Sequence, residues 1–346
     1  SRLREVLALT EVIPDAVIIL NKSGNIENLN TSAMQMLNIS DQDIGLSLVS
    51  IVRNPDLIEF LKSDTPVSAL EFPSPFSPDC TLEARRFDNG VGGKVVLVRD
   101  ITELNRLLTM RQAFIANVSH ELRTPLTVVS GYLEVMSDAS ADDAMRIALA
   151  TKLNAPVARM QTLVEDLLLL TQLESSSATD EKQEVNMSQV IRAVFEGAKG
   201  LQTGEGQIQL RIESDACVMG VEKELYSVCT NLLGNAIRYS PEGLPIEISW
   251  TNVGDKARFA VTDQGVGIAQ EHISRLTERF YRIDLAGARS RGGTGLGLAI
   301  VKHVLLRHES ALEVESNLGQ GSRFFCDLNP VPAQSKPAAL QSRVSA

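Results

Sequence analysis

A single helical stripe constrains the fold of this chain more than any other feature of its sequence. From position 101 to position 136, apolar side chains recur every three or four residues, which is the spacing of one face of an α-helix. The stripe consists of Ile101, Leu104, Leu108, Ile115, Val118, Leu122, Leu126, Val129, Leu133 and Met136. Only Arg111 interrupts it, so the pattern predicts one continuous helix.

A second long helix is predicted over residues 144–174, after a break at residues 137–142. It carries two neighbouring apolar rows, made of Leu149, Leu153, Met160, Leu163, Leu167 and Leu170 and of Val157, Val164 and Leu168. Two long helices with a short connection form an antiparallel hairpin, and one hairpin cannot bury rows this wide. We therefore expect two chains to form a homodimer through a four-helix bundle. Pro125 and Pro156 each remove a helix hydrogen bond and should bend the two helices.

Shorter elements flank this hairpin, so the expected fold class is multidomain α+β. Residues 1–100 have the pattern of a small α+β domain, with strands and helices at 15–29, 32–37, 56–62, 81–87 and 94–99. Residues 183–329 have the pattern of an α/β sandwich, with helices on one face of a mostly antiparallel sheet. Its strands are expected at 208–212, 246–251, 257–262, 312–316 and 322–328, and its helices at 187–199, 223–238 and 297–306. Residues 101–176 form the third domain, 175–182 a linker and 330–346 a disordered tail.

Composition narrows the classes of function. The 346 residues include 33 basic and 43 acidic side chains, a net charge of −10, which argues against direct nucleic-acid binding. No apolar run is long enough to cross a bilayer. The first residue is not methionine, which fits an excised part of a longer protein. The four cysteines, Cys80, Cys217, Cys229 and Cys326, have no metal-ligand spacing, so we expect buried, reduced thiols.

Three motifs in residues 183–329 point to a nucleotide. Asp263 ends a predicted strand ahead of Gly265 and Gly267, where it can accept a hydrogen bond from an exocyclic amine. Residues 292–297 form a glycine-rich loop that enters a helix, an arrangement suited to phosphate. The third is a helix face with Asn231, Asn235 and Arg238, whose carboxamide oxygens can bind Mg²⁺. Alone, each motif is more often a turn, a loop or plain surface, but their combination is improbable by chance.

Together these motifs resemble the ATP-binding domain shared by histidine kinases, heat-shock chaperones, gyrase and MutL. The asparagine helix resembles its N box, residues 263–267 its G1 box, 278–282 its F box and 292–297 its G2 box. The resemblance implies that Asp263 reads the adenine amino group and that Asn235, helped by Asn231, holds Mg²⁺. It also assigns nucleotide contacts to Arg238, Tyr239, Gly265, Gly267, Phe280, Arg282, Gly293, Gly295 and Gly297. A mobile lid is expected over residues 282–291, with Arg289 and Arg291 as further phosphate contacts.

The predicted helical hairpin distinguishes between the members of this superfamily. It contains the run Ser119-His120-Glu121-Leu122-Arg123-Thr124-Pro125. His120 points away from the apolar stripe, and a solvated imidazole that is largely neutral near pH 7 is a plausible nucleophile. Glu121 can orient the ring or accept its proton, and Thr124 places a hydroxyl one turn later. The other histidines, His272, His303 and His308, have no such context and are expected to be surface or structural residues.

This run resembles the phosphoacceptor motif of the dimeric sensor histidine kinases. The resemblance implies that His120 attacks the γ-phosphoryl group of ATP·Mg²⁺ and passes it to an aspartate of a response regulator. It also implies a phosphatase activity towards that regulator, with Thr124 at the position associated with it. Residues 1–100 resemble a PAS domain. They contain no histidine to bind haem, and Cys80 has no context that suggests a flavin-adduct cysteine, so we expect a relay without a cofactor.

Within that family, residues 114–136, 273–284 and 295–303 are most similar to the phosphate-regulon sensor kinases. That similarity implies a PhoB-like response regulator, a phosphate transporter with a PhoU-type adaptor, and an inner-membrane anchor outside these residues. The chain would then be the cytoplasmic portion of a membrane sensor. Three alternatives stay open: a superfamily ATPase that forms no phosphohistidine, a pseudokinase scaffold, and the same kinase chemistry serving another stimulus.

Overall fold

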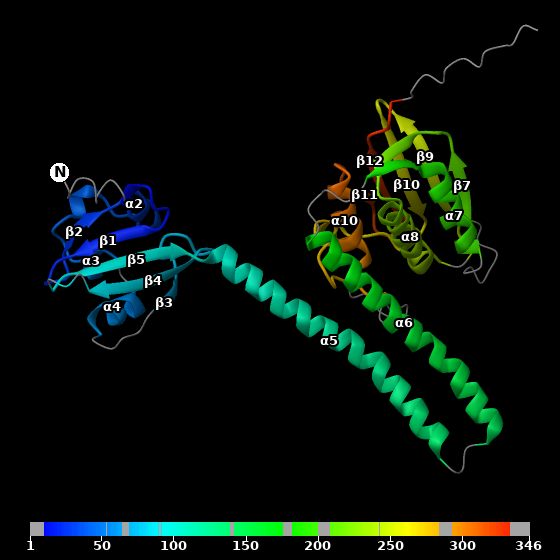
Figure 1. The fold of residues 1–346 in the computed structure, drawn as a ribbon, viewed down its shortest axis with the longest axis horizontal. Coiled ribbons are helices and arrows are strands. Elements are labelled where there is room, and N and C mark those ends of the chain that lie inside the picture. The colour runs from blue at the N-terminus through cyan, green and yellow to red at the C-terminus, as the bar shows by residue number, and fades with distance from the viewer. Residues whose placement is uncertain are drawn as a thin grey trace, which may run out of the picture. The chain divides into compact units, whose positions relative to one another are not determined.

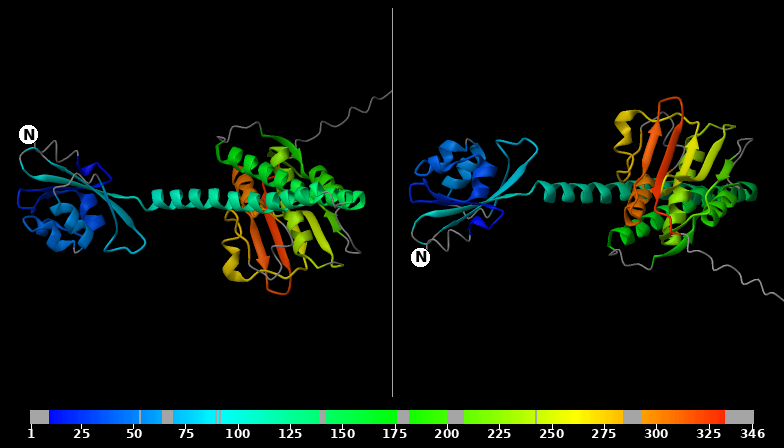
Figure 2. Two further views of the ribbon diagram at one scale, coloured as in Figure 1. Left: turned by 90° about the horizontal axis from the view of Figure 1, so that it is seen from below. Right: turned by 90° about the horizontal axis from the view of Figure 1, so that it is seen from above.

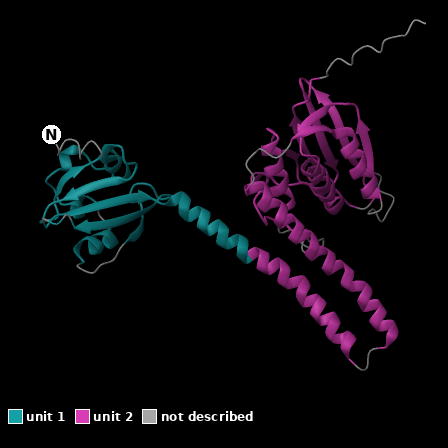
Figure 3. Cartoon of the chain, viewed as in Figure 1, with its two compact units in different colours: residues 1–116 teal, residues 117–346 magenta. Residues whose placement is uncertain are grey.

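The computed structural model describes residues 10–332 except 53, 64–68, 89, 91, 139–141, 176–181, 200–207, 242 and 284–292. The chain divides into two compact units, Ser1–Ala116 and Asn117–Ala346 (Figure 3). The boundary falls inside one long helix, α5 (Thr102–Ser137). In the described ranges, no helix combines the length and the apolar character that a membrane span requires.

The first unit is built on a five-stranded antiparallel sheet with strand order β2-β1-β5-β4-β3. Its elements are β1 (Ala16–Leu20), β2 (Ile26–Leu29), α2 (Thr31–Leu37), η1 (Asp41–Asp43), α3 (Leu48–Ile51), α4 (Pro55–Lys62), β3 (Leu70–Pro73), β4 (Thr81–Asp88) and β5 (Lys94–Asp100). The expected hairpin, helices and strands are confirmed, and Ile18, Phe72 and Leu82 lie in a shared core. α3 and β3 were not predicted, because four residues are too few to show a period.

The helical hairpin is confirmed as α5 and α6 (Asp143–Ser175). In Figure 1, α6 runs back along the second half of α5. Pro125 lies inside α5 and Pro156 inside α6, as predicted. Large apolar side chains on both helices stay exposed in a single chain, among them Leu126, Leu133 and Leu168.

The rest of the second unit is the predicted α/β sandwich. Its main sheet has strand order β11-β12-β10-β9-β7, antiparallel except for the parallel pair β7 and β9. The strands are β7 (Ile208–Ile212), β9 (Ile246–Val253), β10 (Lys256–Asp263), β11 (Glu313–Ser316) and β12 (Ser322–Leu328). The helices are α7 (Met187–Lys199), α8 (Glu222–Tyr239), α9 (Gln270–Ile273) and α10 (Gly297–Arg307). Figure 2 shows this sheet and its helices from two further sides.

Two features at the edge of the sandwich differ from the prediction. β6 (Gln183–Asn186) and β8 (Cys217–Gly220) form a separate two-stranded sheet that the sequence did not predict, since each is only four residues long. Pro330 forms a bridge to Val218, so the start of the predicted tail packs onto β8. The remainder of that tail, residues 333–346, lies outside the described residues, as does most of the predicted linker.

The cysteines are free, but only Cys229 and Cys326 are buried. Burial raises the pKa of Cys326 to about 12 and that of Cys229 well above its ordinary value, so both stay protonated. Cys80 and Cys217 are half-buried, and the prediction that all four are buried is wrong for these two. Cys80 lies in the loop before β4 and packs against the core of the first unit without being enclosed by it, and Cys217 begins a strand of the small sheet.

His308 has the structural role expected for it. Its Nδ1 lies 2.7 Å from the carbonyl oxygen of Val304, and its Nε2 accepts a hydrogen bond from the Val221 N–H at 3.2 Å. These two bonds require a neutral ring with its proton on Nδ1. Burial lowers the pKa of His308, so protonation both costs desolvation and removes the acceptor that Val221 uses.

We expect His308 to make folding stability sensitive to acid. Because its folded pKa lies below the unfolded value of about 6.5, its contribution is complete above that value and is lost as the pH falls through the folded pKa. Urea unfolding at pH 7.5 and pH 5.5 should therefore show a larger acid loss for the wild type than for His308→Gln, whose amide does not titrate. Equal losses in the two proteins would contradict this role.

Candidate active site

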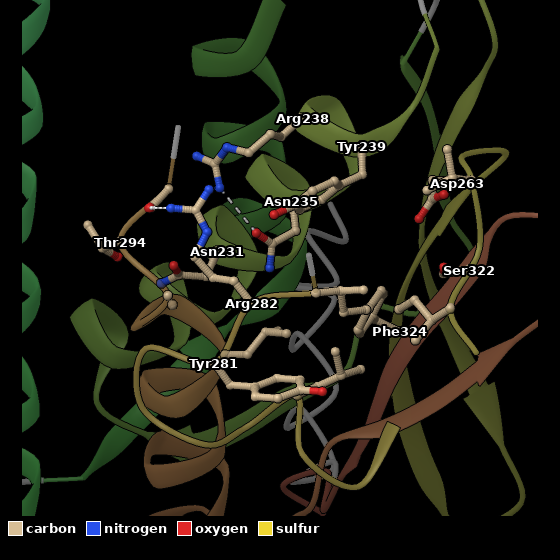
Figure 4. A pocket seen from close by; sticks show the side chains of 18 of the residues that line it. Asn231, Asn235, Arg238, Tyr239, Asp263, Tyr281, Arg282, Thr294, Ser322 and Phe324 are labelled. Atoms are coloured by element: carbon tan, nitrogen blue, oxygen red, sulfur yellow. Dashed lines mark hydrogen bonds between the residues drawn. The ribbon is translucent and has the colours of Figure 1, made fainter. Parts of the chain in front are cut away.

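A cavity of about 400 Å³ opens in the second unit between α6, α8 and the ends of β10 and β12 (Figure 4). Its lining includes Asn231, Asn235, Arg238, Tyr239, Asp263, Gly267, Arg282, Gly293, Gly295 and Gly297, all singled out in the sequence. Gly265 and Phe280 lie beside this lining rather than in it. Gly265 donates its N–H to Asp263, and the Phe280 N–H bonds to the Gly295 carbonyl at 2.8 Å. Arg289 and Arg291 lie outside the described residues.

Asp263 defines one end of the cavity. It is the last residue of β10 and is buried, and its Oδ1 accepts the Gly265 N–H at 2.7 Å. Burial raises the pKa of this carboxyl. At Gly267 the backbone has a φ of 67°, and a side chain would collide with the carbonyl oxygen of Asn317, so only glycine fits. This end can therefore receive a flat group that carries a hydrogen-bond donor.

The opposite end of the cavity is cationic. Figure 4 shows Arg238 and Arg282 at this end, with Asn235 between them and Asp263. Nη1 of Arg238 donates to Oδ1 of Asn235 at 3.4 Å, and Nη1 of Arg282 donates to the Gly293 carbonyl at 3.1 Å. Burial lowers the pKa of Arg238. A side chain on Gly293 would lie 2.9 Å from Arg238, so this glycine leaves the guanidinium its space. Guanidinium groups in this arrangement suit a polyphosphate.

The two asparagines of α8 present oxygens between these ends. Nδ2 of Asn231 donates to the Ser227 carbonyl at 2.9 Å, and its Oδ1 faces Gly297 at the start of α10. Within the described ranges, no group of three or more His, Cys, Asp and Glu side chains could hold a metal ion. A cation here would therefore depend on carboxamide oxygens and on the oxygens of a bound ligand. Mg²⁺ tolerates this, because it usually takes few protein ligands together with substrate phosphates.

One wall of the cavity, supplied by α6, was not predicted from the sequence. Arg159, Thr162 and Asp166 lie on one face of this helix and line the cavity. Oδ2 of Asp166 accepts a hydrogen bond from the Thr294 hydroxyl at 2.8 Å, and burial raises the pKa of this carboxyl. The sequence offered one sign of this wall, the carboxylate of Asp166 among the apolar residues of a helix that was assigned to the bundle.

The residues singled out on α5 lie together on the hairpin. His120 is exposed, which confirms the expectation that it faces solvent. Oε2 of Glu121 accepts a hydrogen bond from Nη2 of Arg159 at 2.8 Å, and the Thr124 hydroxyl donates to the His120 carbonyl at 3.3 Å. An exposed imidazole, a neighbouring carboxylate and a hydroxyl one turn later are thus presented on one stretch of helix.

Comparisons with known proteins assign these parts to a family. Residues 110–176 match the His Kinase A (phospho-acceptor) domain, and residues 220–332 match the Histidine kinase-, DNA gyrase B-, and HSP90-like ATPase domain. The Phosphate regulon sensor protein PhoR of Pseudomonas aeruginosa is 39% identical over 327 residues, which cover 93% of this chain and 73% of that protein. The chain belongs to the PhoR-like sensor histidine kinases.

Further relatives support the same family assignment. PhoR of Haemophilus influenzae is 34% identical over 316 residues, covering 90% of this chain and 73% of that protein. The Sensor-like histidine kinase SenX3 of Mycolicibacterium smegmatis is 36% identical over 243 residues, covering 69% and 62%. The histidine kinase ThkA, solved in complex with the response regulator protein TrrA, shares the fold with a TM-score of 0.53 and 21% identity, over 93% of this chain and 97% of that one.

The comparisons therefore confirm the predicted fold class, the ATP-binding domain and an ATP-dependent histidine kinase activity. They exclude the alternative of a superfamily ATPase without kinase chemistry.

Proposed function

We propose that this kinase autophosphorylates on His120 and transfers the phosphoryl group to an aspartate of a PhoB-like response regulator during phosphate starvation. The main observation behind this proposal is that one unit contains a cavity and a phosphoacceptor helix together. The cavity has Asp263 at one end and arginines at the other, and the helix exposes His120 beside Glu121. The 39% identity to PhoR over most of the chain supports the phosphate stimulus.

In the proposed reaction, Asp263 accepts a hydrogen bond from the adenine amino group, while Arg238 and Arg282 bind phosphate oxygens. Asn235, with Asn231, would hold Mg²⁺, which offsets the negative charge on the phosphates when bound. A ring nitrogen of His120 attacks the γ-phosphorus, so an N–P bond forms as the P–O bond to ADP breaks. Glu121 accepts the ring proton that this step displaces. We also propose Arg289 and Arg291 as phosphate contacts.

The proposal extends to the rest of the chain. Residues 1–100 would be a PAS-like relay, 101–176 the dimerisation and phosphoacceptor domain, and 183–329 the ATP-binding domain. The antiparallel sheet of the first unit supports the PAS assignment, and the exposed apolar residues on α5 and α6 support a homodimer. We propose that the chain works as the cytoplasmic part of an inner-membrane sensor, with a PhoU-type adaptor and a phosphate transporter as partners.

A phosphotransfer assay tests the proposed function and its stimulus. The kinase would be incubated with labelled ATP and then with a panel of purified response regulators. We expect acid-labile label on the kinase and fastest transfer to a phosphate-regulon regulator. Faster transfer to a regulator of another pathway would contradict the phosphate stimulus while leaving the kinase assignment intact.

In the same assay, Thr124→Ala should keep autophosphorylation but lose dephosphorylation of the regulator. The hydroxyl lies one helical turn from His120, where it can hold a water molecule near the regulator's phosphoaspartate. Thr127→Ala is the matched control, because the Thr127 hydroxyl makes the same kind of helix bond, to the Arg123 carbonyl at 2.9 Å. If both variants dephosphorylate the regulator at the wild-type rate, Thr124 has no such role.

A further inference from the structure

Arg159 connects the phosphoacceptor segment with the nucleotide cavity. Its Nη2 donates to Oε2 of Glu121 at 2.8 Å, and the same side chain lines the cavity. Glu121 directly follows His120 on α5. The side chains of Arg159 and Glu121 are 32% and 27% exposed, so water still reaches both partners of the ion pair. An ion pair of this kind is readily exchanged for a stronger one.

The cationic end of the cavity is a cluster of three arginines. Among the described lining residues, these are Arg159, Arg238 and Arg282, and the carboxylates are Asp166 and Asp263. The charges of Arg282 and Arg159 add to burial in lowering the pKa of Arg238, so the three guanidinium groups act on one another. Like charges held together in a partly buried cavity favour a polyanionic ligand.

Several contacts fix α6 as a wall of this cavity. Asp166, two turns after Arg159 on the same face, accepts the hydrogen bond from Thr294 in the glycine loop. Near the end of α6, Glu174 pairs with Arg279 and lies 3.6 Å from Nε2 of His303. Arg159 is therefore presented to the cavity by a helix that is attached to the ATP-binding domain at two further points.

We propose that Arg159 is a phosphate-binding residue contributed by the helical hairpin, and that the triphosphate and Glu121 compete for it. A triphosphate carries more charge than one carboxylate and also attracts Arg238 and Arg282, so it should draw Arg159 away from Glu121. Nucleotide binding would then free the carboxylate beside His120 for its role as proton acceptor. The consequence for catalysis rests on the proposed roles of His120 and Glu121, whereas the competition does not.

Calorimetric titration of the whole chain with AMP-PNP and with adenosine, in the presence of Mg²⁺, tests the phosphate contact. Arg159→Ala should weaken AMP-PNP binding by roughly tenfold and leave adenosine binding unchanged, because only the phosphates lose a partner. Arg159→Lys should recover most of the loss. The control is Lys152→Ala, which removes an exposed cation two turns earlier on α6 and should change neither affinity. Equal weakening of both ligands by Arg159→Ala would overturn the proposal.

A double-mutant cycle tests the competition. Glu121→Gln should tighten AMP-PNP binding several-fold when Arg159 is present and have no effect in the Arg159→Ala background. An equal change in both backgrounds would show that Glu121 does not act through Arg159, and would overturn the competition. The rate of autophosphorylation, measured at varied ATP concentrations, should support the same conclusion. Arg159→Ala should raise KM for ATP and retain kcat, whereas Glu121→Gln should lower kcat. Because the binding cycle involves no phosphoryl transfer, its outcome is independent of whether His120 is the acceptor.

Discussion

Replacing His120 with alanine is expected to abolish autophosphorylation while ATP binding persists. The side chain is exposed on α5 and lines no part of the nucleotide cavity, so its removal should take away the acceptor and leave the cavity intact. Label from ATP should fall to background, a loss of more than about a thousandfold, because no other group takes over the role of a missing nucleophile.

Two measurements make this result specific. Calorimetry with AMP-PNP should give the same affinity for His120→Ala and for the wild type, which shows that the variant is folded and binds nucleotide. Ser119→Ala, a truncation of the neighbouring residue, serves as the control and should label normally. Substantial acid-labile label on His120→Ala with normal nucleotide binding would place the phosphoacceptor elsewhere.

Asp263→Asn should be the most damaging change inside the cavity. The amide keeps an oxygen that can accept the Gly265 N–H, so the local turn survives. Its second atom becomes a donor, which repels the adenine amino group instead of accepting its hydrogen bond. A hydrogen bond to a charged group is worth about 1.5–3 kcal/mol, so ATP affinity should fall by roughly ten- to 150-fold.

A comparison of ATP with ITP distinguishes a loss of base recognition in Asp263→Asn from general damage to the cavity. ITP carries a keto oxygen in place of the amino group, so the wild type should reject it strongly. Asp263→Asn can donate a hydrogen bond to that oxygen and should therefore bind ITP at least as tightly as ATP. Glu247→Gln is a suitable control, because it neutralises a carboxylate on the neighbouring strand β9, outside the cavity lining. Preserved preference for ATP in Asp263→Asn would show that another group reads the base.

The sequence predicted those parts of the molecule whose signals are local. The stripe on α5 extends over ten turns, and Asp263, Gly265 and Gly267 form a motif within five residues, so each could be recognised without tertiary information. The helix face with Asn231, Asn235 and Arg238 was equally visible, since helical spacing alone brings those side chains together. All of these cavity residues except Gly265 lie in the lining itself.

Contacts between distant segments could not be predicted in the same way. Asp166 and Thr294 are separated by 128 positions, and nothing in either neighbourhood indicates that they meet. Arg159 and Glu121 are 38 positions apart on two helices whose relative register is set by a connection that sequence does not determine. The wall that α6 adds to the cavity is therefore a product of tertiary packing, not of any motif.

That wall has a practical consequence for inhibitor selectivity. Residues 220–332 match a domain family that also includes DNA gyrase B and HSP90. A compound that contacts only Asp263 and the glycine loop would therefore contact only residues inside this shared domain. Thr162 and Asp166 lie outside the matched residues, on the hairpin, yet they line the same cavity. A compound that reaches from Asp263 to these two side chains would discriminate against ATP-binding domains that lack such a helix.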